Sequence, residues 1–235
     1  MSADNSVRHK LARLTDVSGA TTDLTHGLRV ALKIGMAEEG YHFGLRPEFV
    51  RPVADAVNAA TQTRPVVCDG LKLIEYWNGV RGNNFMKLAG SLGFSSETLG
   101  GHFVTNGGFS GDEGDQFLCK LSDSELGGVE VGTAVCRSDA LWVLTHVTLH
   151  PLMGLNGALL NAGFDCLLGR ARTRLLRSLN PYIFNGSKPL LPDLQAFQRR
   201  AVESHLGVKA AVTDHMFFIN LSLTCGIRRM LCSSI

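Results

Sequence analysis

Short apolar runs alternate with helix-patterned segments along this chain, and few folds accept that alternation. Residues 28–34 are apolar and β-branched, as is typical of a strand. Residues 47–60 begin with a proline and carry apolar side chains three to four positions apart, which predicts a helix. Residues 64–68 form a second strand-like run. A strand, helix, strand order normally gives two parallel strands joined by a right-handed crossover.

The rest of the chain continues the alternation. Residues 140–145 form the clearest buried strand, residues 216–223 a further one, and residues 154–168 are small and apolar, which favours a helix packed close to the sheet. We therefore expect a single α/β domain over residues 1–235, with a mostly parallel sheet and helices on both faces. Other expectations are an amphipathic helix at 7–17, a short helix at 85–92, a surface loop at 100–114, a strand or helix start at 129–135, and a helix at 193–205 capped by Asp193.

Composition narrows the class of function. The chain has 235 residues and a formal net charge of +2, from 23 Lys and Arg against 21 Asp and Glu. A charge this small does not favour nucleic-acid binding, because proteins that follow phosphates concentrate many more cations on one face. No apolar run approaches the roughly 20 residues that a membrane helix needs, and the polar first residues are not the pattern expected of a signal peptide. We expect a cytoplasmic protein that binds a small-molecule substrate.

The cysteines do not form a readable metal site. The six are spread along the chain without a Cys-x-x-Cys pair, whereas cluster and zinc ligands usually come closely paired. Most are expected to be buried, reduced thiols. The chain also has no Walker, Rossmann or nucleophile-elbow motif. We predict neither a metal site nor a cofactor.

Two histidines follow the clearest strand. His146 and His150 lie four residues apart, just before Pro151, at a strand end where α/β proteins place reactive groups. Two imidazoles could relay protons near neutral pH. They could also bind a metal, or His146 could simply hold the loop while His150 is exposed. We expect Pro151 to turn His150 away, so His146 is the principal acid–base candidate.

A second group of polar residues follows the strand at 64–68. Asp69, Glu75 and Arg81 could bind a polar substrate, since a guanidinium offers two parallel hydrogen bonds to a carboxylate. A solvated ion pair is the alternative. Four arginines crowd residues 170–177 and could receive a phosphate or carboxylate, or form a solvated helix face or an interface.

Several segments, in order, resemble one known family. The chain is similar to the iron–sulfur family called domain of unknown function 362 over roughly residues 28 to 170, with a weaker echo at 217–220. The resemblance rests on VALKIGMAEEG at 30–40, RPEFVRP at 46–52, DALWVLTHVTLH at 139–150 and GLNGALLNAGFDC at 154–166.

The departures from that family are equally informative. The family usually carries two cysteine-rich cluster-binding runs after the position of Arg170, and this chain has no cysteine between Arg170 and Asp193. The resemblance therefore implies a truncated, divergent member without the ferredoxin insert. Thr148 and Leu160 stand where the family typically has lysines. The chain also stops short of the usual family length, which leaves a homo-oligomer or a partner subunit open.

The resemblance adds candidate site residues. Cys166 matches a family cysteine and could act as a nucleophile if a nearby cation lowered the pKa of its thiol, although plain burial is the alternative. Lys33 and Glu39 align with the family pattern, and Asn161 lies within its last segment. We assign catalytic roles to His146, His150, Cys166 and Lys33, and substrate binding to Asp69, Arg81, Glu39 and Asn161.

Three hypotheses of function follow. The first is a cluster-free enzyme of small-molecule biosynthesis that works by proton transfer, as an isomerase, cyclase or lyase does. The second is a redox or metal-binding protein that still assembles a cluster or ion, and the third is a non-catalytic binding subunit. The first hypothesis requires Lys33, Asp69 and His146 to converge on one cleft.

Overall fold

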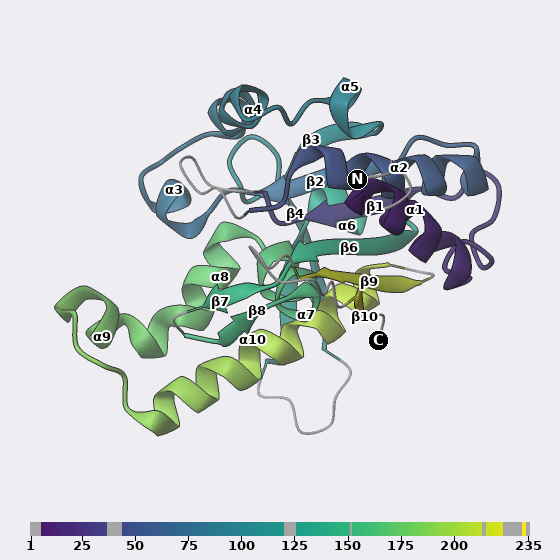
Figure 1. Cartoon of the computed structure of the whole chain (residues 1–235). Coiled ribbons are helices and arrows are strands. Elements are labelled where there is room, and N and C mark those ends of the chain that lie inside the picture. Colours follow the sequence, from purple (N-terminus) through teal and green to yellow (C-terminus); the bar gives the residue numbers. More distant parts are fainter. Residues whose placement is uncertain are drawn as a thin grey trace.

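A six-stranded sheet forms the centre of the fold (Figure 1). The computed structural model describes residues 6–36, 44–119, 126–150, 152–212, 215–222 and 232–233. The strand order is β10-β9-β6-β1-β2-β3; β9, β6, β1, β2 and β3 are parallel, and β10 is antiparallel to β9. The strands are β1 Val30–Ile34, β2 Val66–Gly70, β3 His102–Asn106, β6 Ala140–His146, β9 Met216–Leu221 and β10 Cys232–Ser233.

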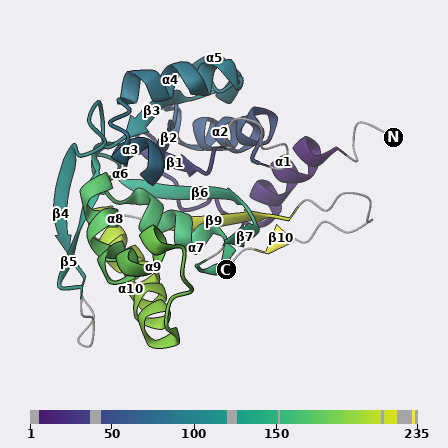
Figure 2. The same cartoon turned by 90° about the vertical axis from the view of Figure 1, so that its left-hand side faces the viewer.

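Helices cover both faces of this sheet, as the sequence predicts, and Figures 1 and 2 show the two layers. None of the helices in the described ranges is long and apolar enough to cross a membrane. On one side lie α1 Val7–Val17, α2 Pro47–Thr61, α4 Gly82–Ser91 and α5 Ser96–Leu99, with α3 Leu73–Trp77 near the edge. Around the other face are α6 Thr133–Cys136, α7 Ala158–Ala162, α8 Gly169–Leu175, α9 Asn180–Asn185 and α10 Leu191–Ala211, with the short 3-10 turns Phe164–Cys166 and Leu176–Leu179.

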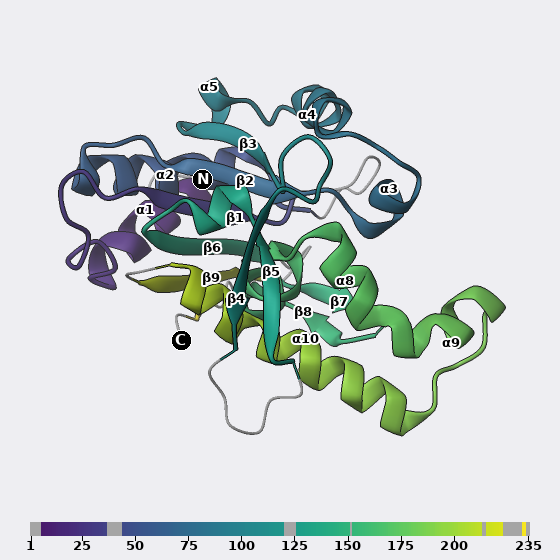
Figure 3. The ribbon, with the colours of Figure 1, turned by 180° about the vertical axis from the view of Figure 1, so that it is seen from behind.

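Two small antiparallel pairs complete the fold. The pair of β4 Gly114–Leu118 and β5 Gly128–Gly132 runs from the sheet toward α10, as Figure 3 shows from behind. The pair of β7 Thr148–His150 and β8 Gly154–Asn156 directly follows β6 and forms a short hairpin. This hairpin lies beside the carboxyl end of β6, where the functional candidates gather.

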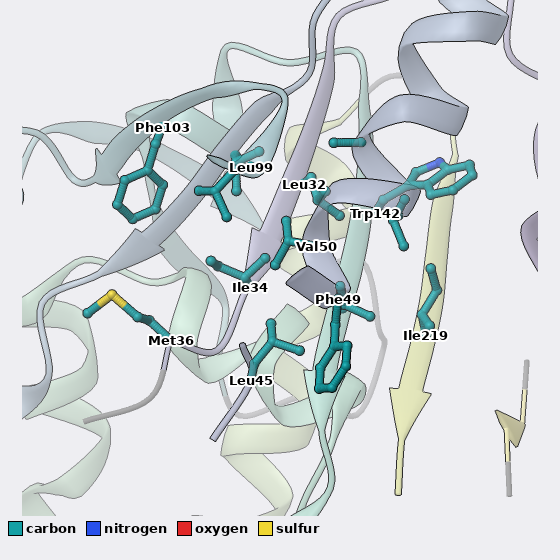
Figure 4. Packing of buried hydrophobic residues seen from close by; sticks show 14 of the residues in the cluster. Leu32, Ile34, Met36, Leu45, Phe49, Val50, Leu99, Phe103, Trp142 and Ile219 are labelled. Carbon is teal, nitrogen blue, oxygen red and sulfur yellow. The ribbon is translucent and has the colours of Figure 1, made fainter. Parts of the chain in front are cut away.

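Each face of the sheet has its own apolar core because alternate side chains of a strand point to opposite faces. On the α2 side, Leu32 pairs in register with Val67 and Trp142, and Figure 4 shows Leu32 and Ile34 facing Val50 of α2. On the other side, a second cluster packs around Leu141 and Val143, with the rings of Phe164 and Phe197 edge to face at 5.8 Å.

Most strand and helix predictions agree with the structure. The strands predicted at 28–34, 64–68, 140–145 and 216–223 are β1, β2, β6 and β9, and the helices predicted at 7–17 and 47–60 are α1 and α2. The last long helix is α10, longer than the predicted 193–205. Asp193 does not cap it, because the helix begins two residues earlier; instead its carboxylate accepts a 2.6 Å hydrogen bond from the Tyr182 hydroxyl.

Two of the predicted segments were assigned the wrong structure. Residues 100–114 are not one surface loop, since β3 lies within them and pairs with β2 along its whole length. Residues 154–168 are not one helix. Gly154 has φ +73° within the β7–β8 hairpin, and α7 ends at Gly163, where a Cβ atom would approach Ser204 Oγ of α10 to 2.8 Å. The undecided segment 129–135 is both elements, as β5 ends where α6 begins.

Candidate functional site

The strand order reverses between β1 and β6. The chain places β2 and β3 on one side of β1, and β6 and β9 on the other. Open α/β sheets bind ligands at the carboxyl ends of the strands beside such a reversal. A cavity of about 280 Å³ lies at this position, lined by the residues that follow β1, the end of β6, the β7–β8 hairpin, Lys72, Asn161 and Asp165. We call it the switch-point pocket.

A buried ion pair lies beneath this pocket. Lys33 Nζ is 2.7 Å from Asp69 Oδ1, with 0% and 3% of the two side chains exposed. The second carboxylate oxygen accepts the backbone N–H of Met36 at 2.8 Å and lies 3.6 Å from Lys72 Nζ. Lys33 also donates to the carbonyl oxygen of Ile34 at 2.9 Å. Because partners surround both charges, the pair can persist without water.

Asn161 of α7 connects the ion pair to the pocket wall. Its Oδ1 accepts a hydrogen bond from Lys33 Nζ at 2.5 Å, and its Nδ2 donates to Thr145 Oγ1 at 2.7 Å. An ammonium group can only donate, so Lys33 fixes which end of the amide faces it. Asn161 and Thr145 both line the pocket while remaining almost fully buried.

The ion pair keeps both of its charges at neutral pH. Burial alone would lower the pKa of Lys33, but the Asp69 carboxylate reverses that effect and raises the pKa to about 12. Burial alone would raise the pKa of Asp69, and the cations of Lys33 and Lys72 hold it below its usual range. Lys33 is therefore a fixed cation, which does not support the proton-transfer role suggested by the sequence.

His146 ends β6 and lines the pocket. Its side chain is 7% exposed, and its backbone pairs in register with Leu221 of β9. The strand pairing thus fixes the backbone position of His146, directly after Thr145 in the sequence. Lys33 and Asp69 lie behind the same pocket, joined to its wall through Asn161.

His150 of β7 lines the same pocket, so the expectation that this residue turns away is wrong. The β7–β8 hairpin folds it back, whereas Pro151 lies outside the described residues. His150 Nδ1 accepts the backbone N–H groups of Leu152 and Met153 at 3.2 and 3.1 Å. Burial lowers the pKa of His150, and the Asp165 carboxylate partly opposes this. The neutral ring therefore carries its hydrogen on Nε2.

The other predicted binding residues lie elsewhere. Arg81 is exposed at the start of α4, with its guanidinium carbon 5.9 Å from the centre of the Phe109 ring, and it is not part of the pocket lining. Glu75 accepts the backbone N–H of Lys72 at 2.7 Å and so holds the start of α3. Glu39 lies outside the described residues.

Sequence reasoning grouped Arg172 with the other arginines of residues 170–177 as possible anion-binding residues and did not single it out. Its side chain is 4% exposed, and Nη2 donates to the carbonyl oxygen of Leu71 at 2.7 Å. Burial lowers the pKa of Arg172, and the carboxylates of Asp165 and Asp69 oppose that effect. Helical periodicity could have distinguished Arg172 from its neighbours. Arg170 and Arg174 share a helix face and both pair with one glutamate of β5, while Arg172 points the other way.

Thr145, Lys72 and Asp165 were missed, although all three line the pocket. The available signals were position alone. Thr145 precedes His146 on the strand, and Lys72 follows Asp69 by three residues. A larger and more open hollow of about 440 Å³ lies between α1 and α2, lined by Arg8, His9 and neighbouring residues. None of the predicted site residues lines it.

The pattern of residues 30–228 matches the family described as "Domain of unknown function (DUF362)". The chain belongs to the DUF362 family. This match covers every strand of the main sheet except β10, and it includes the switch-point pocket. The family resemblance predicted from the sequence is thus confirmed.

Two solved structures resemble this DUF362 chain. One is the lactate racemase apoprotein from Thermoanaerobacterium thermosaccharolyticum, with TM-score 0.57 and 14% identity over 93% of this chain and 49% of that one. The other is a Thermotoga maritima protein, with TM-score 0.49 and 11% identity over 99% of this chain and 54% of that one. The chain spans about half the length of each. No curated protein matches it.

The cysteines of this DUF362 chain do not fit an iron–sulfur cluster within the described ranges. No group of three or more His, Cys, Asp or Glu side chains there is arranged to hold a metal ion. Cys166 is fully buried, burial raises the pKa of its thiol, and Sγ donates to the carbonyl oxygen of Asn161 at 3.3 Å. These surroundings favour the protonated thiol and do not support a nucleophile. Cys225 lies outside the described residues.

Proposed function

We propose that this DUF362 chain is an enzyme domain that transfers protons on a small polar substrate in the switch-point pocket. The observation that carries the proposal is that two imidazoles, His146 from β6 and His150 from β7, line one pocket where the strand order reverses. Histidine titrates nearest to neutral pH of the common side chains, so it suits general acid–base work. Isomerases, cyclases and lyases are the reaction classes that need such chemistry.

The two histidines would have different roles. The backbone N–H groups on Nδ1 of His150 favour its neutral form, and a neutral ring with hydrogen on Nε2 donates a hydrogen bond rather than accepting a proton. His146 is then the principal acid–base residue. The Lys33, Asp69 and Asn161 network behind the pocket supplies a rigid wall, because each member is buried and hydrogen-bonded.

The proposal can be tested without knowing the natural substrate. Small oxo, hydroxy and amino acids would be incubated with the protein in deuterium oxide, and exchange of carbon-bound hydrogen would be followed by proton NMR. With any substrate found, His146→Ala should lower the exchange rate by roughly 100-fold to 10,000-fold, the usual contribution of a general acid–base group. The thermal unfolding midpoint would establish that the variant is folded.

The matched control is His102→Ala. His102 is an exposed histidine at the start of β3, away from the pocket, so its removal should leave the exchange rate unchanged. A folded His146→Ala variant with near-normal exchange would rule out His146 as the acid–base residue. Equal losses in both variants would point to a general effect on the fold.

A non-catalytic binding domain is the second candidate. Leu149 and Leu155 face each other across the β7–β8 hairpin and are 86% and 64% exposed, and Leu149 also lines the pocket. Exposed leucines beside a pocket are typical of surfaces that contact another molecule. Saturable ligand binding with no exchange of any bound compound would favour this candidate.

A further inference from the structure

The hydroxyl group of Thr145 has a donor to spare. A hydroxyl can donate one hydrogen bond and accept two. Thr145 Oγ1 accepts from Asn161 Nδ2 at 2.7 Å, and no acceptor for its own hydrogen occurs among the described residues. The side chain is 2% exposed yet lines the switch-point pocket. A ligand oxygen in the pocket is thus a suitable acceptor.

The hydrogen bonds behind Thr145 all point the same way. Lys33 donates to Asn161, and Asn161 in turn donates to Thr145. The first hydrogen bond of this series is charge-assisted because its donor is an ammonium group. Successive hydrogen bonds in a buried series polarise one another. Each group in this series is therefore a stronger hydrogen-bond donor, and the last of them is the Thr145 hydroxyl at the pocket.

The charges around the pocket favour a negative ligand. Three positive charges, those of Lys33, Lys72 and Arg172, interact electrostatically with the two carboxylates of Asp69 and Asp165. Among these described groups one positive charge is left over. Lys72 lines the pocket itself, with 28% of its side chain exposed. An anionic oxygen would balance the charge where the free donors are.

We propose that the Thr145 hydroxyl, held by Asn161 and polarised by Lys33, donates a hydrogen bond to a carboxylate oxygen of the substrate, with Nε2–H of His150 as a second donor. The inference rests on the proposed function and narrows its substrate class to small carboxylates. It also separates two neighbours in the chain: Thr145 binds the anion, and His146 moves the proton. The lysine side chain acts through Asn161 and does not touch the substrate.

Oxalate, a small carboxylate, is the probe for this site, and calorimetric titration measures its affinity. Thr145→Val keeps the shape but removes the hydroxyl, so oxalate should bind about 10-fold to 100-fold more weakly, as expected for one lost hydrogen bond to a charged group. Thr145→Ser keeps the hydroxyl and should stay within about threefold of the unmodified protein. Oxamide, the neutral analogue, should bind at least about tenfold more weakly than oxalate.

Thr145→Val also leaves Asn161 Nδ2 without its acceptor, which could itself disturb the fold. A further variant therefore helps to distinguish loss of the hydroxyl donor from misfolding. Thr145→Cys offers a weaker S–H donor and should lose affinity relative to Thr145→Ser. Equal oxalate affinity in the hydroxyl and non-hydroxyl variants, equal affinity for oxamide, or no saturable oxalate binding would overturn the inference. Binding is measured without turnover, so a failure of proton exchange would count against the proposed function alone.

Discussion

At the scale of single residues, the buried Lys33–Asp69 pair supports the wall of the pocket that the two histidines line. A charge is expensive to bury, and this pair is tolerated because Asn161, Met36 and Ile34 complete its hydrogen bonds. Two apolar side chains could fill the same space without the free-energy cost of removing charges from water. The fixed cation instead orients an amide and a hydroxyl at the pocket wall, which an apolar pair cannot do.

Replacing Lys33 should therefore be costly. Lys33→Met removes one partner and leaves the Asp69 carboxylate buried, so the free energy of unfolding should fall by about 3–5 kcal/mol. The matched control is Arg29→Met, which breaks the Arg29–Asp139 pair at the surface, where 62% of the arginine side chain is exposed. That loss should be much smaller because water solvates the remaining charge. Urea unfolding measures both, and equal losses would contradict the buried-pair argument.

The sequence made most of these residues candidates but could not connect them. Lys33, Asp69, Asn161 and His146 were all predicted from strand ends or from the family resemblance. Their contacts depend on the register of β1 against β2 and on where α7 begins, and both are set by long-range packing. Thr145 lies within the family-like run 139–150, but nothing in that run distinguishes its hydroxyl from other strand residues, so residue types alone could not select it.

At the scale of elements, close contacts between neighbouring elements determine helix ends and packing that the periodicity of the sequence does not predict. Gly207 of α10 packs directly on β5, and a Cβ atom there would overlap the side chain of Val129 and lie 3.1 Å from Cys119 Sγ. The same principle ends α7 at Gly163 and breaks the helix predicted over 154–168. Small residues that look neutral in the sequence thus set where elements meet. The strand β3 was missed for a related reason, because glycines flank a run of only five residues.

Adding one methyl group to α10 should show this. In an open helix position, Gly→Ala stabilises by about 0.4–1 kcal/mol, and Gly90 of α4 has such open space. Gly90→Ala should therefore raise the free energy of unfolding, whereas Gly207→Ala should lower it by about 1–3 kcal/mol through overpacking. Thermal and urea unfolding would report both signs. Stabilisation by Gly207→Ala would mean that α10 and β5 are not in close contact.

At the scale of the whole molecule, the sequence predicted a parallel α/β sheet but not its strand order. No local sequence pattern predicts that β6 pairs with the far side of β1, because β3, the β4–β5 pair and α6 lie between them in the sequence. That return creates the reversal, and the reversal creates the pocket. The prediction of helices on both faces followed from apolar runs buried on both sides, which is a local property.

The buried pair should also shape how the stability of the whole molecule depends on pH. The pKa of Asp69 is lowered by folding, so its contribution is present above its unfolded pKa of about 3.9 and is lost as the pH falls below that value. The pKa of Lys33 is raised to about 12 from 10.5, so its contribution is complete below pH 10.5 and is lost as the pH rises toward 12. Between these limits the contribution should be constant.

A double variant isolates this dependence. Lys33→Met with Asp69→Leu removes both charges but keeps His150, whose lowered pKa makes both proteins less stable as the pH falls below about 6.5. The difference in unfolding free energy between the unmodified protein and the double variant should therefore stay flat from about pH 4 to pH 10 and fall at either end. Urea unfolding across that range measures it. A difference that stays flat at both extremes would show that the two groups titrate alike in the folded and unfolded chains, and the fixed cation behind Thr145 would lose its basis.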